Sequence, residues 1–153
     1  MKKRKLYFLV ALLITTCVLA LLMTGSSLLN VNLAKQSSIP LGTYITWAGM
    51  TSLPLSVYWG FKRLRKPNSS LTRFLSSLLK IIIVMGILWV PISYLLSGNL
   101  SFSFSETDTF QGGQTAMRWF WRLSYGVAVG SILVFLIYWI SLLFKKSKKK
   151  SMD

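Results

Sequence analysis

The stretch LYFLVALLITTCVLALLMT, residues 6–24, decides the fold class of this chain. A helix needs roughly 20 apolar residues to cross about 30 Å of hydrocarbon, and this stretch has nearly that length without a charged residue. The basic sequence MKKRK before it is also found in secretory signals, but the apolar stretch is too long for one and no A-x-A cleavage site follows. We therefore expect a retained membrane helix, with a cleaved signal as the alternative.

Three further stretches of the chain have the length and composition of membrane helices. They cover residues 39–61, 74–96 and 123–144. Pro54 and Pro91 lie inside the first two of these, and a membrane helix tolerates a proline when a neighbour satisfies the carbonyl that it frees. The sequence therefore predicts an all-α integral membrane protein, a bundle of four transmembrane helices forming a single domain.

The charge of the chain predicts its orientation. There are 18 Lys and Arg against 3 Asp and Glu, and 14 of the basic residues fall in three blocks, residues 2–5, 62–73 and 145–150. Cytoplasmic loops retain positive charge, so we expect both termini inside, an external loop of residues 97–122, and a basic cytoplasmic tail of residues 145–153. The tail suits anionic lipids of the inner leaflet. Because the blocks flank apolar stretches instead of forming one basic face, we expect no nucleic-acid binding.

The composition excludes several kinds of chemistry. The chain has no histidine and one cysteine, Cys17, so it has no intramolecular disulfide and no cysteine cage for a metal. We expect no metal and no cofactor. No Asp or Glu lies inside a predicted span, whereas proton-coupled pumps and exporters need an ionisable group at membrane depth. We therefore do not expect a proton-coupled transporter.

The sequence RWFWR, residues 118–122, precedes the fourth predicted span. A helical spacing of four sets Arg118 and Arg122 on one face, while the indoles of Trp119 and Trp121 suit the boundary between water and lipid. The simpler interpretation is an interfacial anchor whose arginines contact lipid phosphates. The sharper hypothesis is an external binding site in which the arginines hold an anionic group or a protein partner.

Glu106 and Asp108 are the only acidic residues before the terminal Asp153, and both belong to the predicted external loop. We expect them to be solvated or paired with the arginines of the RWFWR segment, and we include both among the candidate residues of the external binding site. In the same loop, residues 100–105 alternate apolar residues with serine, as a short strand would; an irregular segment at the bilayer interface is the alternative.

Small residues at a spacing of four predict close helix packing. Gly126 and Gly130 form a GxxxG pattern in the fourth span, and Ala48, Ser52 and Ser56 repeat the spacing in the second. We expect these two faces to pack against each other inside the bundle. A homo-oligomer or a protein partner is the alternative use of the same faces.

The leading hypothesis for function is a small, non-enzymatic protein of a bacterial plasma membrane that acts by binding. It would be an accessory subunit of a membrane assembly or a protective protein of the immunity type. A pore-forming or transport protein, broadly similar to phage holins, is the first alternative. A lipid-modifying enzyme is the second, using Ser76, Ser77 and Lys80 or the two loop carboxylates.

Overall fold

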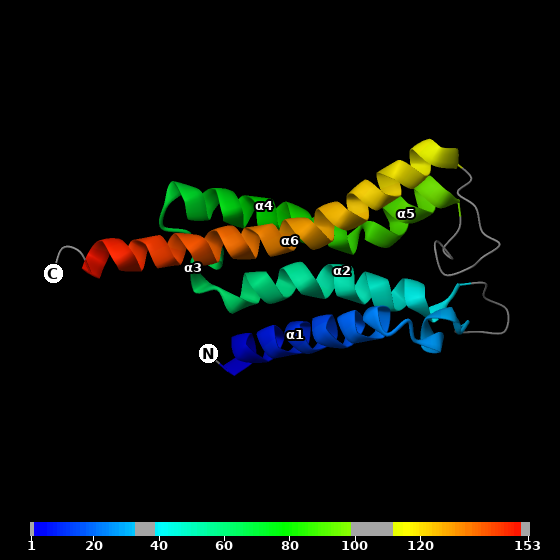
Figure 1. Ribbon diagram of the computed structural model, residues 1–153, viewed down its shortest axis with the longest axis horizontal. Coiled ribbons are helices and arrows are strands. Elements are labelled where there is room, and N and C mark those ends of the chain that lie inside the picture. Colours follow the sequence, from blue (N-terminus) through cyan, green and yellow to red (C-terminus); the bar gives the residue numbers. More distant parts are fainter. Residues whose placement is uncertain (1, 33–38, 99–111, 151–153) are drawn as a thin grey trace.

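The computed structural model describes residues 2–32, 39–98 and 112–150. These residues form helices and no strand, apart from one isolated bridge between Asn32 and Pro40. The helices, in chain order, are α1 (Lys2–Met23), η1 (a 3₁₀ turn, Ser27–Asn30), α2 (Leu41–Gly60), α3 (Lys62–Arg65), α4 (Ser70–Ile87), α5 (Trp89–Ser97) and α6 (Gly113–Lys150). The long helices run side by side, and the start of α1 and the end of α6 lie toward the same end (Figure 1).

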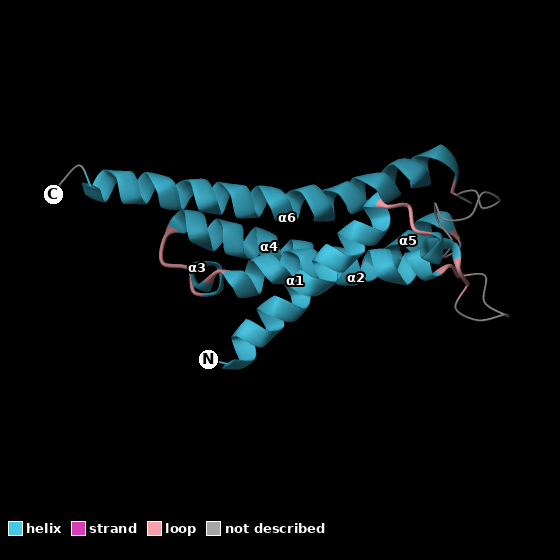
Figure 2. Cartoon of the chain, turned by 60° about the horizontal axis from the view of Figure 1, so that its bottom comes forward, coloured by secondary structure: helices cyan, strands magenta, loops and turns pink. Residues whose placement is uncertain are grey.

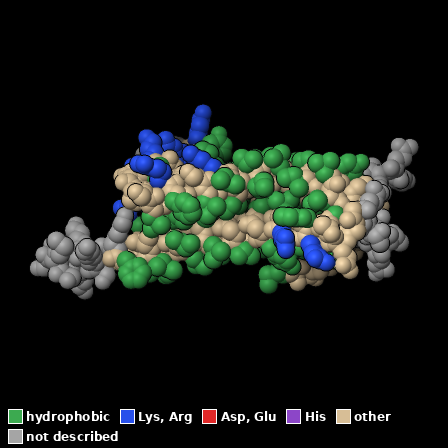
Figure 3. Space-filling model, turned by 90° about the horizontal axis from the view of Figure 1, so that it is seen from above, with side chains coloured by type: hydrophobic (Ala, Val, Ile, Leu, Met, Phe, Trp, Pro, Cys, Tyr) green, Lys and Arg blue, Asp and Glu red, His purple; other side chains and the backbone are tan. Residues whose placement is uncertain are grey.

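Three of the described helices are long and apolar enough to cross a membrane. They are α1, α4 and α6, over Lys3–Met23, Ser70–Ile87 and Gly113–Phe144. This finding agrees with the predicted class of an all-helical membrane protein. On the face seen in Figure 3, apolar side chains cover the middle, and most Lys and Arg side chains gather toward one end.

The helix α2 has the length of a span but a more polar composition, because Thr, Ser, Tyr and Trp take up much of it. It packs against α1, α4 and α6. Its buried residues include the hydroxyl-bearing Thr43, Ser52 and Ser56. Ser52 forms a hydrogen bond with Thr15 of α1, and Thr51 donates to a carbonyl of α4. The hydroxyl of Thr46 is also buried, but it has no hydrogen-bond partner among the described residues.

The helix α1 makes its main contacts with α2, which it crosses at an angle (Figure 2). A side chain at Gly49 would begin 2.6 Å from a methyl group of Val18, so glycine allows the helices to approach closely here. One turn further along, the hydroxyls of Thr15 and Ser52 lie 3.0 Å apart and form a buried hydrogen bond. A small residue and an interhelical hydrogen bond therefore fix the crossing point.

The expected span at residues 74–96, in which a proline was expected to bend the helix, consists of two helices, α4 and α5, with an interruption at Leu88. The interruption lies three residues before Pro91, which has no N–H for the carbonyl of Ile87 and disfavours an unbroken helix. The indole Nε1 of Trp47 on α2 donates to that carbonyl over 3.0 Å. A neighbouring helix thus satisfies the acceptor that the proline frees.

The proline of α2, Pro54, also frees a carbonyl, and this carbonyl faces α4. Pro54 removes the donor for the carbonyl of Met50, and a Cβ at Gly86 of α4 would lie 2.5 Å from that oxygen. Only glycine fits against the carbonyl at this distance. The hydroxyl of Thr51 donates to the carbonyl of Gly86 over 3.3 Å. Both proline sites therefore face the contact between α2 and the α4–α5 pair.

The helix α6 is longer than the expected span of residues 123–144, because it begins at Gly113 and ends at Lys150. The C-terminal part of the expected external loop, residues 113–122, is therefore helical. At 1.5 Å per residue these 38 residues reach about 57 Å, well beyond the hydrocarbon thickness. One face of α6 is buried at spacings of three and four along the helix: Ala116, Phe120, Ser124, Val127, Ser131, Val134 and Tyr138.

The main core lies where α2, α3, α4 and α6 meet. Leu64, Leu75, Leu79 and Val134 are fully buried in it. Ser69 begins α4 with a capping box, in which its hydroxyl and that of Thr72 each accept from the other residue's N–H. The turn before α4 is thus held by local hydrogen bonds.

Candidate functional site

The RWFWR segment lies in the second and third turns of α6, at the end of the molecule opposite α3 (Figure 1). Arg118, Trp119 and Arg122 are exposed, Trp121 is half-buried and Phe120 is buried. The segment therefore divides by helical face, with Phe120 turned inward and Arg118, Trp119 and Arg122 turned outward. The structure brings all four predicted site residues of this segment onto one short stretch of helix.

Arg122 and Trp119 form the closest pair on the outer face. The guanidinium carbon of Arg122 lies 5.1 Å from the centre of the Trp119 ring, a cation–π contact between residues three apart. Trp119 remains 55% exposed. A planar cation stacked on an accessible indole offers both hydrogen-bond donors and apolar area to a partner.

Buried contacts hold this turn of α6 in place from the other side. The rings of Phe120 and Trp89 lie 5.8 Å apart, and the indole of Trp89 donates to the hydroxyl of Ser124 over 2.8 Å. That hydroxyl in turn donates to the carbonyl of Phe120 over 2.9 Å. The exposed pair is therefore mounted on a fixed turn, which lowers the entropy lost when a partner binds.

Trp121 has a different environment from Trp119. Its ring stacks on Tyr125 at 5.5 Å and meets Phe120 edge-on at 5.2 Å. It is thus held between aromatic neighbours along the helix. Glu106 and Asp108, which we expected near the arginines, lie outside the described residues, as does the stretch 100–105.

The serine and lysine residues of the enzyme alternative lie on α4 with different exposure. Ser76 is buried, whereas Ser77 and Lys80 are exposed on α4. Within the described part of the chain, no hydrogen bond joins either hydroxyl to the Lys80 amine. The chain's described residues also contain no group of three or more metal-ligating His, Cys, Asp or Glu.

The small residues predicted to pack together lie in different contacts. Gly126 faces open space. A Cβ at Gly130 would lie 3.1 Å from the Ile82 side chain of α4. Ser52 contacts α1 through Thr15, and Ala48 is exposed beside the same helix. The helices α2 and α6 do pack against each other, and the buried Ser56 lines a cavity together with Ile132 and Phe135 of α6. Direct pairing of the two small-residue faces stays a prediction, and Gly126 is exposed to contact with another molecule.

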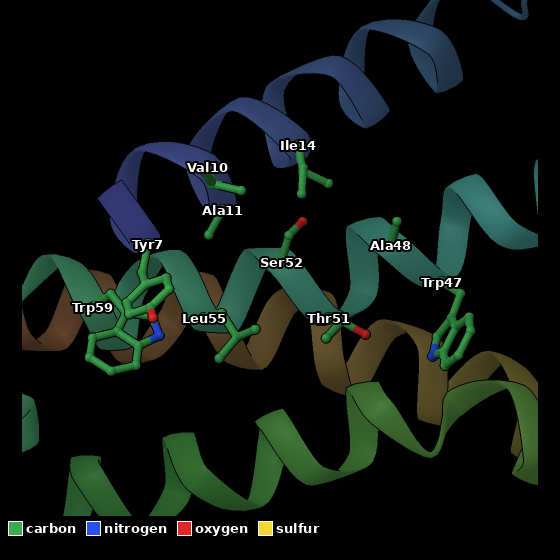
Figure 4. A pocket seen from close by; sticks show the side chains of 10 residues that line it. All are labelled: Tyr7, Val10, Ala11, Ile14, Trp47, Ala48, Thr51, Ser52, Leu55 and Trp59. Atoms are coloured by element: carbon green, nitrogen blue, oxygen red, sulfur yellow. The ribbon is translucent and has the colours of Figure 1, made fainter. Parts of the chain in front are cut away.

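Sequence reasoning missed a groove between α1 and α2, with a volume of about 470 Å³. The face of α1 contributes Tyr7, Val10, Ala11 and Ile14 (Figure 4). The face of α2 contributes Trp47, Ala48, Thr51, Ser52, Leu55 and Trp59 (Figure 4). These residues recur at helical spacings of three and four on each helix. The spacing marks one continuous face of each helix and is the feature of the sequence that indicates the groove. We call this feature the apolar groove.

A second cavity, of about 340 Å³, adjoins the apolar groove at Trp59. Its lining combines four cations with three uncharged residues: Arg4, Lys5, Lys62 and Arg65 with Phe8, Trp59 and Gly60. We call it the cationic crevice. It joins the first turn of α1 to the segment after α2 and so brings together parts of two of the basic blocks of the sequence.

Comparison with models of protein families, with curated proteins and with solved structures finds no match to this chain. The function is therefore argued from the chain's own geometry. That geometry offers two surfaces at opposite ends of the helices: the Arg122–Trp119 pair on α6 and the cationic crevice between α1 and α3.

Proposed function

We propose that this chain crosses a bacterial plasma membrane four times, with both ends in the cytoplasm, and acts there by binding. Three helices have the length and composition of spans, and α2 packs against α1, α4 and α6 with Thr43, Ser52 and Ser56 buried. The Thr15–Ser52 hydrogen bond supports burial of α2 in lipid, because it satisfies a polar group within the bundle. The distribution of Lys and Arg supports the orientation.

The observation that carries the binding role is the stacking of Arg122 on the exposed Trp119. In the proposed orientation this pair lies outside the membrane. Trp and Arg are among the residues that most often dominate the affinity of protein interfaces. Because this pair is held on a fixed turn of α6, less conformational entropy is lost when a partner binds. We infer that the pair contacts an external protein or anionic group, as an accessory subunit or a protective protein would require.

A quantitative pull-down tests this proposal. The full-length tagged protein is isolated in a gentle detergent, and the proteins recovered with it are compared with those of Trp119→Ala/Arg122→Ala. The matched control is Trp139→Ala/Arg73→Ala, which also removes one exposed Trp and one exposed Arg but at other places. Loss of a hot-spot pair should lower recovery of a partner by roughly 30-fold or more, and the control should retain it.

Equal recovery of every partner by the two double variants would overturn the external surface as the binding site. A dye-leakage assay addresses the pore alternative with the same preparation. Vesicles containing the wild-type protein should stay sealed, because the proposed activity needs no path for solutes. Rapid leakage that scales with the protein content of the vesicles would favour the pore.

A further inference from the structure

The cationic crevice collects charges from two distant parts of the sequence. Arg4 and Lys5 come from the first turns of α1, whereas Lys62 and Arg65 come from α3. Like charges brought together repel one another, and the repulsion is relieved when an anion binds. All three acidic residues of the chain lie outside the described residues, so no described carboxylate neutralises the crevice.

Arg65 is held in a fixed position within the crevice. Its Nη1 donates to the carbonyl of Trp59 over 2.8 Å, one of the last carbonyls of α2, which have no donor within the helix. Its guanidinium also lies over the Trp59 ring, 5.5 Å from the ring centre. An arginine has five N–H donors, so this arrangement fixes the group and leaves donors for an anion.

Trp59 forms the boundary between charged and apolar surroundings. One set of contacts places it in the cationic crevice, and its contact with the Tyr7 ring, at 5.4 Å, places it at the end of the apolar groove. Gly60 makes room for the Phe8 ring, because a Cβ at Gly60 would lie 3.1 Å from that ring. From this boundary the groove continues along α1 and α2 past Ala48 to Trp47.

We propose that the crevice and the groove together bind one anionic phospholipid. The phosphate occupies the cationic crevice, and an acyl chain lies in the apolar groove along Ala11, Ala48 and Leu55. Charge complementarity at one end and a continuous apolar lining beyond it match this amphiphile, and basic pockets between membrane helices bind anionic headgroups. In the proposed orientation the crevice lies at the inner leaflet of the membrane. That placement rests on the proposed function, whereas binding of the lipid depends only on the crevice and the groove.

Native mass spectrometry of the delipidated full-length protein in detergent tests the headgroup site. The probes are phosphatidylglycerol and phosphatidylcholine with the same acyl chains. We expect the wild-type protein to bind phosphatidylglycerol more tightly. The variant Arg4→Gln/Lys5→Gln/Lys62→Gln should weaken that binding by on the order of 100-fold at low salt.

The matched control for this variant is Arg63→Gln/Lys66→Gln/Arg73→Gln. It removes the same charge from exposed residues near the same end, but none of them lines the crevice. The control should bind phosphatidylglycerol about as tightly as the wild type. Equal losses in the two triple variants would show only general attraction between charges and would overturn the proposal.

A second pair of variants tests the acyl groove. Ala48→Phe places a ring in the groove from an exposed position, whereas Val129→Phe adds a similar ring on an exposed part of α6. Ala48→Phe should lower lipid binding, and Val129→Phe should leave it unchanged. Unchanged binding in both, or equal binding of the two lipids by the wild type, would overturn the site. An outward-facing N-terminus would refute the proposed orientation while leaving these results intact.

Discussion

The indole of Trp47 donates a 3.0 Å hydrogen bond to the carbonyl of Ile87, the acceptor that Pro91 leaves without a helical donor. Trp47→Phe should therefore destabilise the protein by about 1 kcal/mol, the usual net worth of one such hydrogen bond. The measurement is the thermal unfolding midpoint in detergent. Trp139→Phe is the control, because Trp139 is exposed on α6 and its substitution should not move the midpoint. Equal shifts in the two variants would contradict the role of the hydrogen bond.

Two helical glycines, Gly86 and Gly126, should respond in opposite ways to alanine. A Cβ at Gly86 would lie 2.5 Å from the carbonyl oxygen of Met50, whereas a Cβ at Gly126 would meet open space. We expect Gly86→Ala to cost roughly 1–3 kcal/mol, since backbone must move. Gly126→Ala should be neutral or stabilising, because alanine favours a helix more than glycine does. Unfolding midpoints compare the two, and a loss confined to Gly126→Ala would refute the packing.

The hydroxyls of Thr15 and Ser52 should be energetically coupled. A double-mutant cycle with Thr15→Val and Ser52→Ala should give a coupling free energy of roughly 0.6–2 kcal/mol, as for hydrogen bonds between membrane helices. Thr16→Val replaces Thr15→Val in the control cycle, because the Thr16 hydroxyl donates to Leu12 of its own helix. Strict additivity in the first cycle would show that the crossing of α1 and α2 does not depend on this bond.

Arg118 and Arg122 carry a prediction of their own. Arg118→Ala with Arg122→Ala should impair partner recovery in the pull-down, while the protein still inserts in the membrane. Because Arg118 has an exposed side chain and Arg122 stacks on Trp119, neither is part of the core. Full recovery of the partner by this variant would count against the external surface.

The helices α1, α4 and α6 were predictable because their apolar stretches are long enough to meet the requirement of the bilayer. The interruption at Leu88 was harder to locate from sequence. Pro91 indicated a distortion. The hydrogen-bond donor at the interrupted helix, however, is the indole of Trp47, which lies 40 residues before its acceptor Ile87 in the sequence. Only the tertiary contact identifies it.

The start of α6 was predicted too late because Gln114, Thr115, Arg118 and Arg122 interrupt the apolar stretch. Ala116 and Phe120 nevertheless continue the buried spacing of Ser124 and Val127, and they pack beside α5. The spacing was therefore a usable signal. The cationic crevice had no such signal, because its basic residues come together only when the first turn of α1 lies beside the end of α2 and α3.

The most direct test of the central claim is the sidedness of residues before and after α2. In a Cys17→Ser background, Ser27→Cys and Asn68→Cys are treated in intact cells with a maleimide that does not cross membranes. Both positions are exposed, and α2 lies between them. Four crossings with both ends inside predict labelling of Ser27→Cys in intact cells, and labelling of Asn68→Cys only after permeabilisation. Labelling of both positions from the same side, or the reverse pattern, would contradict the account.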